Sequence, residues 1–218
     1  MRCTRLSYET RVDEGCRRHR TARLAVVSLV DRTVFVVADG GCTAAGGIAV
    51  AQALCDAVVG LSKRRTRPRW GDWICSIERG ARGALLPAVS VLEVTDEGHA
   101  IGASLGDCRA WLFSRQNASL ELSRHALGRR ALNDCVALVT FETNIESGVL
   151  VLATDGLWRH ACTRAIGDAT ALGSLDAAAT LMVEEARLGT GRLEDDIALA
   201  VCRVDRQAGT PSASRWHR

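Results

Sequence analysis

The stretch that decides the fold class is Val34-Phe35-Val36-Val37-Ala38-Asp39-Gly40-Gly41. Its apolar, β-branched-rich residues predict a buried strand, which the acid and the two glycines bring to an end. Leu24 to Val30 has the same character and lies just upstream, across Asp31-Arg32. The two runs together predict a hairpin that leaves Asp39 at the border of a strand, where a carboxylate is held firmly while its oxygens stay outside the core.

Helix and strand patterns follow this hairpin in separate blocks. The spacing of apolar residues predicts a helix from Ala44 to Leu61, and a second helix is expected around Trp73 to Leu86, after a basic loop from Lys63 to Arg69. A meander is expected at 88–94, 100–105 and 109–113, with later strands at 136–141, 149–154 and 197–204 and a helix at 175–188. Antiparallel strand runs with helices in two batches predict an α+β layered sandwich and not a doubly wound parallel sheet.

Length and composition bound the class of protein. The 218 residues, 47% of them hydrophobic, suit one domain, expected over residues 1–206 and followed by a disordered basic tail at 207–218. The net charge of +3 lacks the basic excess of a nucleic-acid binder, so no nucleic-acid partner is expected. Nine cysteines without a C-x-x-C pair predict reduced thiols. Because no apolar run reaches the roughly 18 residues of a membrane span, we expect a cytoplasmic protein with no membrane partner. We also expect a monomer.

Two more acids share the local design of Asp39. Asp155 and Asp195 also border hydrophobic strands, and glycine directly follows Asp39 and Asp155. Gathered carboxylates raise one another's pKa unless a cation neutralises them, and oxygen-only ligation suits Mg²⁺ or Mn²⁺ better than zinc. Two such ions sharing Asp39, with the Gly40 carbonyl as a further ligand, would lower the pKa of a bridging water and aim hydroxide at phosphorus. A lone Asp-Gly pair after a strand is more often a turn, so the order and context of the whole set decide.

Four short motifs follow one another along the chain: the opening stretch, Ser104-Leu105-Gly106-Asp107-Cys108-Arg109, Val151-Leu152-Ala153-Thr154-Asp155-Gly156-Leu157-Trp158 and Asp195-Asp196-Ile197. In this order they resemble the V-A-D-G-x-G-G, G-D-S-R, L-x-S-D-G-L-W and D-[ND]-I motifs of the protein phosphatase 2C (PPM) family in its compact bacterial form. The resemblance covers about residues 15 to 205. It implies a four-layer α-β-β-α sandwich, in which two antiparallel sheets lie between pairs of helices.

The same resemblance implies a role for each acid. Asp39 would bridge two metal ions, and Gly40 would give its carbonyl to one of them. Asp155 and Asp195 would hold the other ion, while Asp107 matches a family position linked to a weaker third metal. The implied cofactor is Mn²⁺ or Mg²⁺, as two ions and in some members a third.

The N-terminal motif of the family is only partly matched. Gly15-Cys16-Arg17-Arg18-His19-Arg20-Thr21-Ala22-Arg23 aligns without a gap with G-x-x-R-x-x-N-[EQ]-D, which makes Arg18 the phosphate-binding arginine and a member of the catalytic set. Ala22-Arg23 replaces an acidic pair that organises water around the metals, so this cation could weaken metal binding or act as a second phosphate clamp. The family's histidine near the D-G block has no counterpart in Gly41-Cys42-Thr43-Ala44-Ala45, and only Ser123-Arg124-His125 echoes its T-x-D-H segment.

The leading prediction is metal-dependent hydrolysis of phosphoserine and phosphothreonine by a metal-bound water. The expected partners are phosphorylated protein substrates of a serine/threonine kinase. The sequence has no G-x-x-x-x-G-K-[ST] P-loop, which removes one other common enzyme class. Two alternatives remain: a catalytically impaired pseudophosphatase that binds phosphoproteins or regulates a partner, and a purely structural module. The structural module ranks last, because folding alone does not require three carboxylates at strand ends.

Overall fold

The computed structural model describes residues 4–16, 21–41, 46–80, 87–114, 119–124, 129–132 and 136–206. The strands are β1 (Thr4–Asp13), β2 (Ala22–Ser28), β3 (Arg32–Asp39), β4 (Ala88–Thr95), β5 (His99–Leu105), β6 (Arg109–Phe113), β7 (Ser119–Glu121), β8 (Arg129–Leu132), β9 (Val136–Asn144), β10 (Ser147–Ala153) and β11 (Ile197–Arg206). The helices are α1 (Gly46–Ser62), α2 (Trp70–Gly80), α3 (Asp155–Trp158), α4 (Thr163–Thr170) and α5 (Leu175–Glu185).

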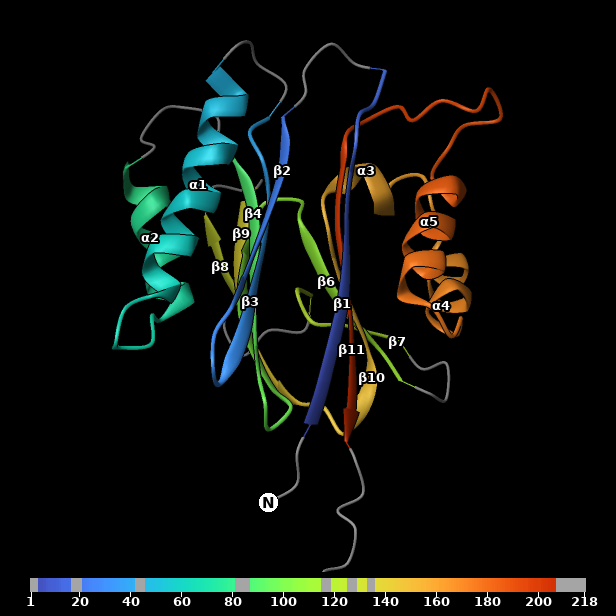
Figure 1. Cartoon of the computed structure of the whole chain (residues 1–218). Coiled ribbons are helices and arrows are strands. Elements are labelled where there is room, and N and C mark those ends of the chain that lie inside the picture. The colour runs from blue at the N-terminus through green and yellow to red at the C-terminus, as the bar shows by residue number, and fades with distance from the viewer. Residues whose placement is uncertain are drawn as a thin grey trace, which may run out of the picture.

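The strands form two antiparallel sheets that pack face to face (Figure 1). One sheet has the order β1-β11-β10-β6-β7 and the other the order β2-β3-β4-β5-β9-β8. Helices α1 and α2 cover the outer face of the β2–β8 sheet, and α4 and α5 cover the outer face of the β1–β7 sheet. This arrangement confirms the predicted fold class, a four-layer α-β-β-α sandwich.

Side chains that alternate along the central strands fill three apolar layers. In β3, Phe35 and Val37 point into the core between the sheets, whereas Val34, Val36 and Ala38 point toward α1 and α2. Strand β11 alternates in the same way between the inter-sheet core and the layer under α4 and α5. A strand that is buried on both faces needs an unbroken apolar run, which is why the sequence predicts these strands clearly.

The predicted meander is correct for two strands and wrong for the third. β4 and β5 form a hairpin whose turn has Gly98 at φ +80° and a hydrogen bond of 2.9 Å from the Gly98 N–H to the Thr95 carbonyl. At the next turn, Gly106 at φ +73° lies between β5 and β6. β6 then pairs with β10 of the other sheet, with Arg109 opposite Ala153. An apolar run predicts a strand without specifying its partner, so this switch of sheet was missed.

Five elements of the described part of the chain have no counterpart in the sequence prediction, namely β1, β7, β8, α3 and α4. The edge strand β1 was not predicted, because its sequence TRLSYETRVD has no apolar run. Helix α4 was missed as well. The second helix begins at Trp70 and is described as far as Gly80, and residues 81–86 and the tail predicted at 207–218 lie outside the described residues. None of the helices in the described part of the chain combines the length and apolarity needed to cross a membrane.

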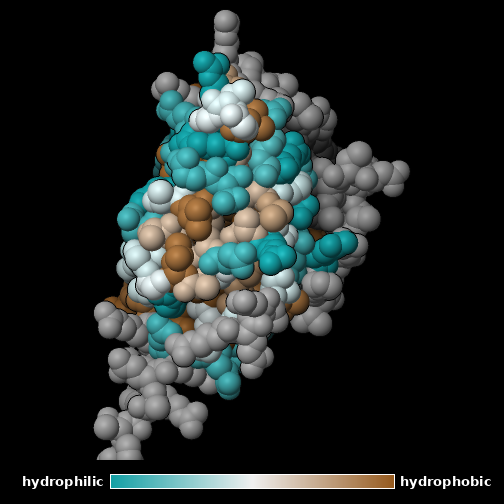
Figure 2. All heavy atoms as spheres, turned by 90° about the vertical axis from the view of Figure 1, so that its right-hand side faces the viewer, coloured by the Kyte–Doolittle hydropathy of each residue, from teal (hydrophilic) through white to brown (hydrophobic). Residues whose placement is uncertain are grey.

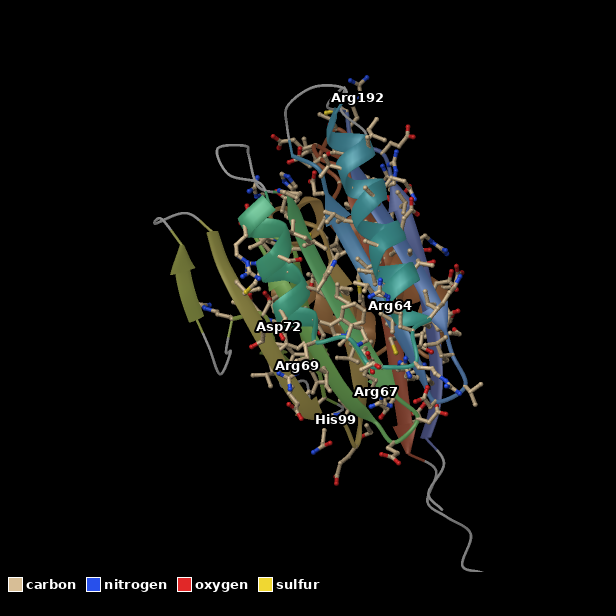
Figure 3. All side chains as sticks on the ribbon, turned by 90° about the vertical axis from the view of Figure 1, so that its left-hand side faces the viewer. Arg64, Arg67, Arg69, Asp72, His99 and Arg192 are labelled. Carbon is tan, nitrogen blue, oxygen red and sulfur yellow. The ribbon has the colours of Figure 1, made fainter. Side chains whose placement is uncertain are left out.

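The basic loop lies at the end of the molecule opposite Arg192 (Figure 3). Arg64, Arg67 and Arg69 project from the connection between α1 and α2 at this lower end. Arg67 pairs with Asp31 of the β2–β3 turn at 3.0 Å, so one arginine of the loop helps to hold it on the sheet.

The outer face of α4 and α5 shows apolar patches among polar side chains (Figure 2). Leu172 and Leu181 are each 37% exposed, and Leu188 is 39% exposed. Partly exposed apolar residues of this kind are ordinary on a protein surface, and they do not by themselves mark a partner.

Candidate active site

Strand register brings the predicted acids to one end of the molecule. Asp39 is the last residue of β3 and pairs with Ala88, where β4 begins. In the other sheet β10 ends where β11 begins, so Asp155, just after β10, and Asp195, just before β11, lie at neighbouring strand ends. Asp107 lies in the turn through which the chain passes from one sheet to the other. The acids therefore meet at the upper end of the sandwich in Figure 1, beside α3.

Asp39 is held in place through one carboxylate oxygen. The Thr21 hydroxyl and the Gly41 N–H both donate to Asp39 Oδ1, each at 2.8 Å. A Cβ on Gly40 would lie 1.9 Å from the carbonyl oxygen of Gly47, so only glycine lets α1 start this close to the end of β3. Thr21 was not predicted as a site residue, and only its place two residues before the aligned Arg23 could have suggested a role.

Asp155 opens the short helix α3, which is fixed onto the start of β11. The hydroxyl of the preceding Thr154 donates to the Asp196 carbonyl at 3.2 Å and accepts from the Ala198 N–H at 3.0 Å. A Cβ on Gly156 would lie 2.4 Å from the Asp196 carbonyl oxygen, so glycine is required here too. The backbone of two strands thus sets the position of the Asp155 carboxylate.

Asp107 is joined to α3 by a tryptophan and an arginine. Trp158 Nε1 donates to the Asp107 carbonyl at 2.7 Å. Arg159 Nη2 lies 2.7 Å from Asp107 Oδ2, and Arg159 Nη1 lies 3.1 Å from Asp155 Oδ2. The Arg109 guanidinium stacks 3.5 Å from the centre of the Trp158 ring. Arg159 was not predicted as a site residue, although its spacing of four residues from Asp155 on a helix is a signal for an ion pair.

Burial and crowding of charge both act on the carboxyl of Asp155. Burial raises its pKa from 3.8 to about 6, the Arg159 guanidinium opposes this rise, and Asp39, Asp195 and Asp107 add to it. The Cys108 thiol is fully buried beside the same acids, and burial followed by Asp39, Asp155 and Asp107 raises its pKa well above the usual value. A thiol in this state is a poor nucleophile, so Cys108 packs as an inert side chain.

Asp196 connects the start of β11 to the segment between β1 and β2. Its Oδ1 accepts from the Gly15 N–H at 2.8 Å and its Oδ2 from the Thr21 N–H at 2.6 Å. These two hydrogen bonds lie at either end of the segment that carries Arg18. Arg18 itself lies outside the described residues, as do Cys42 and His125.

Ala22 and Arg23, which stand where the family motif has an acidic pair, both lie on β2. Their side chains point to opposite faces of the strand. Ala22 pairs with Asp39 and is buried in the core between the sheets. Arg23 is the next residue, its guanidinium donates to the Ala22 carbonyl at 2.7 Å, and its charge acts on Cys55 of α1. Because neighbouring residues of a strand point to opposite faces, Arg23 and Ala22 do not share one position in the site.

The residue types at this site suit a divalent cation, but the described side chains are not spaced as a complete coordination shell. The side chains concerned are carboxylates, the ligands that Mg²⁺ and Mn²⁺ prefer. Burial is the largest cause of the raised pKa of Asp155, and the negative charges of Asp39, Asp195 and Asp107 add to it. Within the described ranges, no three His, Cys, Asp or Glu side chains are arranged as a ready coordination shell. The guanidinium of Arg159 stands between Asp107 and Asp155.

A polar pocket of about 330 Å³ adjoins Asp107. Arg109, Ser123 and Arg124 contribute to its lining. Arg124 is exposed, and its backbone N–H donates to the Glu121 carbonyl at 3.3 Å. The pocket thus places two guanidinium groups beside the acidic end of the sandwich.

The chain is similar in structure to several solved phosphatases. The S. agalactiae serine/threonine phosphatase matches with a TM-score of 0.70 at 15% identity, over 91% of this chain and 99% of that one. The catalytic domain of the serine threonine protein phosphatase PstP, solved with two manganese ions, matches with 0.64 at 15% identity, over 93% and 99%. RsbX in complex with magnesium matches with 0.65 at 13% identity, over 93% and 96%. No protein-family model and no curated protein matches the sequence. Two antiparallel sheets between helices, matched over nearly the whole chain, show that this protein has the fold of the protein phosphatase 2C type.

Proposed function

We propose that this chain is a phosphoprotein phosphatase that hydrolyses phosphoserine and phosphothreonine with the help of Mn²⁺ or Mg²⁺. The observation that carries the proposal is that Asp39, Asp155 and Asp195 lie at strand ends on one side of the sandwich, close enough for the charges of Asp39 and Asp195 to act on Asp155. The ions present in PstP and RsbX support a divalent cation as the counter-charge. The substrates would be phosphoproteins made by a serine/threonine kinase.

Each acid has a proposed task and residues that support it. Asp39, Asp155, Asp195 and the Gly40 carbonyl would hold the cations. When bound, the ions would withdraw charge from the phosphate and acidify a water molecule. Thr21 keeps Asp39 in one orientation through its 2.8 Å hydrogen bond.

Arginine side chains are the proposed phosphate and substrate contacts. A guanidinium binds two phosphate oxygens at once, and Arg18 is proposed for this role because the segment around it is tied to Asp196. Arg124, beside the pocket next to Asp107, would contact the peptide that carries the phosphate.

The proposal is tested by turnover of p-nitrophenyl phosphate and of a phosphothreonine peptide with added Mn²⁺. We expect activity that requires the metal and falls to background in Asp39→Asn and in Asp155→Asn. Asp168→Asn, which removes an exposed carboxylate on α4, is the matched control and should keep full activity. Absence of metal-dependent turnover in the unmodified protein would overturn the proposal.

A pseudophosphatase that binds phosphoproteins is the second candidate. It is favoured by the ion pairs that Arg159 makes with Asp107 and Asp155. It is also favoured by the absence of a ready coordination shell among the described residues. Calorimetry separates the two candidates. Binding of Mn²⁺ that Asp155→Asn abolishes supports the enzyme, whereas affinity for a phosphopeptide without any metal binding supports the pseudophosphatase.

A further inference from the structure

We infer that Arg159 is a built-in cation that occupies the Asp107 side of the acidic cluster and restricts metal binding to Asp39, Asp195 and the remaining oxygen of Asp155. The inference rests on the proposed function in one respect, namely that these acids bind a divalent cation. It concerns a residue for which the sequence motifs gave no role.

The contacts of Arg159 are those of a bridging cation. Its two terminal nitrogens lie 2.7 Å from Asp107 Oδ2 and 3.1 Å from Asp155 Oδ2, so one guanidinium spans both carboxylates. The planar fork of arginine suits such a double contact, whereas a lysine would reach one acid at a time. A divalent ion that used the same two oxygens would have to displace this side chain.

The backbone around Arg159 fixes it in this place. Leu157 of α3 is fully buried, and Gly156 fits against the Asp196 carbonyl with no room for a Cβ. The Arg159 N–H donates to the Asp155 carbonyl at 3.0 Å, so the two side chains lie on the same side of a helical turn. Trp158 holds the other partner, because its Nε1 donates to the Asp107 carbonyl at 2.7 Å.

Exposure decides where the bridge has its largest effect. The Asp155 side chain is 15% exposed, whereas those of Arg159 and Asp107 are 42% and 57% exposed. An ion pair between exposed groups contributes little, but a charge beside a mostly buried carboxylate is poorly screened. The effect of Arg159 should therefore act mainly through Asp155, which the proposed metal site shares.

Calorimetric titration with Mn²⁺ alone tests the inference, comparing the unmodified protein with Arg159→Ala and Arg159→Gln. Removal of the guanidinium should tighten Mn²⁺ binding on the order of tenfold, because a competing positive charge leaves Asp155. Arg164→Ala is the matched control, since it removes an arginine that is 92% exposed on α4, and it should leave the affinity unchanged.

A second measurement needs no metal. In EDTA, Arg159→Ala should lower the thermal midpoint, because the repulsion between Asp107 and Asp155 is no longer offset, and the loss should be smaller in an Asp107→Asn background. An Arg159→Ala protein whose Mn²⁺ affinity equals or falls below that of the unmodified protein overturns the inference and leaves the proposed function standing. Binding only after Arg159 is removed supports the inference and overturns the proposed function. If neither protein binds Mn²⁺, both are overturned.

Discussion

The backbone N–H of Thr21 donates to the Asp196 carboxylate at 2.6 Å, across a separation of 175 residues. The other oxygen of the same carboxylate accepts from Gly15, so one buried acid closes both ends of the segment that joins β1 to β2. A Cβ on Gly15 would lie 2.5 Å from the Asp195 backbone, which shows how closely the two segments pack. Hydrogen bonds and close packing therefore hold the segment of Arg18 against the backbone of the candidate metal ligand Asp195.

We expect Asp196→Asn to lower both the stability and the activity of the protein. Each lost hydrogen bond to a charged acceptor costs about 1.5–3 kcal/mol, and an amide can replace only one of the two acceptor oxygens. Urea unfolding measures the loss, and Asp168→Asn should change it by less than about 0.5 kcal/mol. Full stability in Asp196→Asn would show that the two hydrogen bonds do not hold the segment.

Asp155 should make the metal-free protein less stable as the pH rises. Its pKa is about 6 in the folded chain against the ordinary 3.8, so the folded state holds the proton more tightly. The contribution of this group to stability is full below pH 3.8 and is lost as the pH rises through 6. In EDTA, Asp155→Asn should therefore melt at a higher temperature than the unmodified protein at pH 8, and this difference should shrink toward pH 4. A difference that is the same at both pH values contradicts the assignment.

A buried ion pair at the opposite end should affect stability without touching the site. Glu93 is 2% exposed, accepts from Trp70 Nε1 at 3.1 Å, and has one oxygen 3.5 Å from Arg32 Nε and 3.6 Å from Arg67 Nε. Glu93→Gln keeps an oxygen for Trp70 and removes the negative charge beside the buried Arg32. Because Arg32 still pairs with Asp31 at 2.8 Å, the cost should be about 1–3 kcal/mol.

Chemical denaturation measures this cost, with the exposed Glu185→Gln on α5 as a control that should be neutral. The Mn²⁺ affinity of the Glu93→Gln protein should stay within about twofold of the unmodified value, because distant and independent sites do not couple. A clear change in metal affinity would show that the two ends of the sandwich communicate.

The central strands could be predicted because a strand that is buried on both faces has an unbroken run of apolar residues. Phe35 and Val37 fill one layer and Val34, Val36 and Ala38 the next, so β3 reads as an unbroken apolar run. Strand β1 pairs with β11 along its full length, yet it is an edge strand and needs no such run. Its residues therefore gave no signal.

The sequence marks the candidate acids but not the residues that contact them. Asp39 and Asp155 stand out because each follows a strand and precedes glycine. Their neighbours Thr21 and Arg159 are recognised only through contacts between elements that the fold brings together. The switch of β6 into the second sheet belongs to the same class, because pairing is a property of register and not of composition.

Close packing of the β3–α1 junction gives the last prediction, which compares two glycines. A Cβ on Gly40 would lie 1.9 Å from the carbonyl oxygen of Gly47, a backbone atom that cannot move without shifting α1. A Cβ on Gly60, near the other end of α1, would meet nothing within 4 Å. Gly40→Ala should therefore destabilise the protein by about 1–3 kcal/mol through overpacking. It should also weaken Mn²⁺ binding, because Gly41 and Thr21 would no longer hold Asp39 in its present orientation.

Gly60→Ala should instead stabilise the protein by roughly 0.5–1 kcal/mol, since alanine is the better helix former. Equal effects of the two substitutions in thermal unfolding would show that the junction is not tightly packed and that Asp39 does not depend on it.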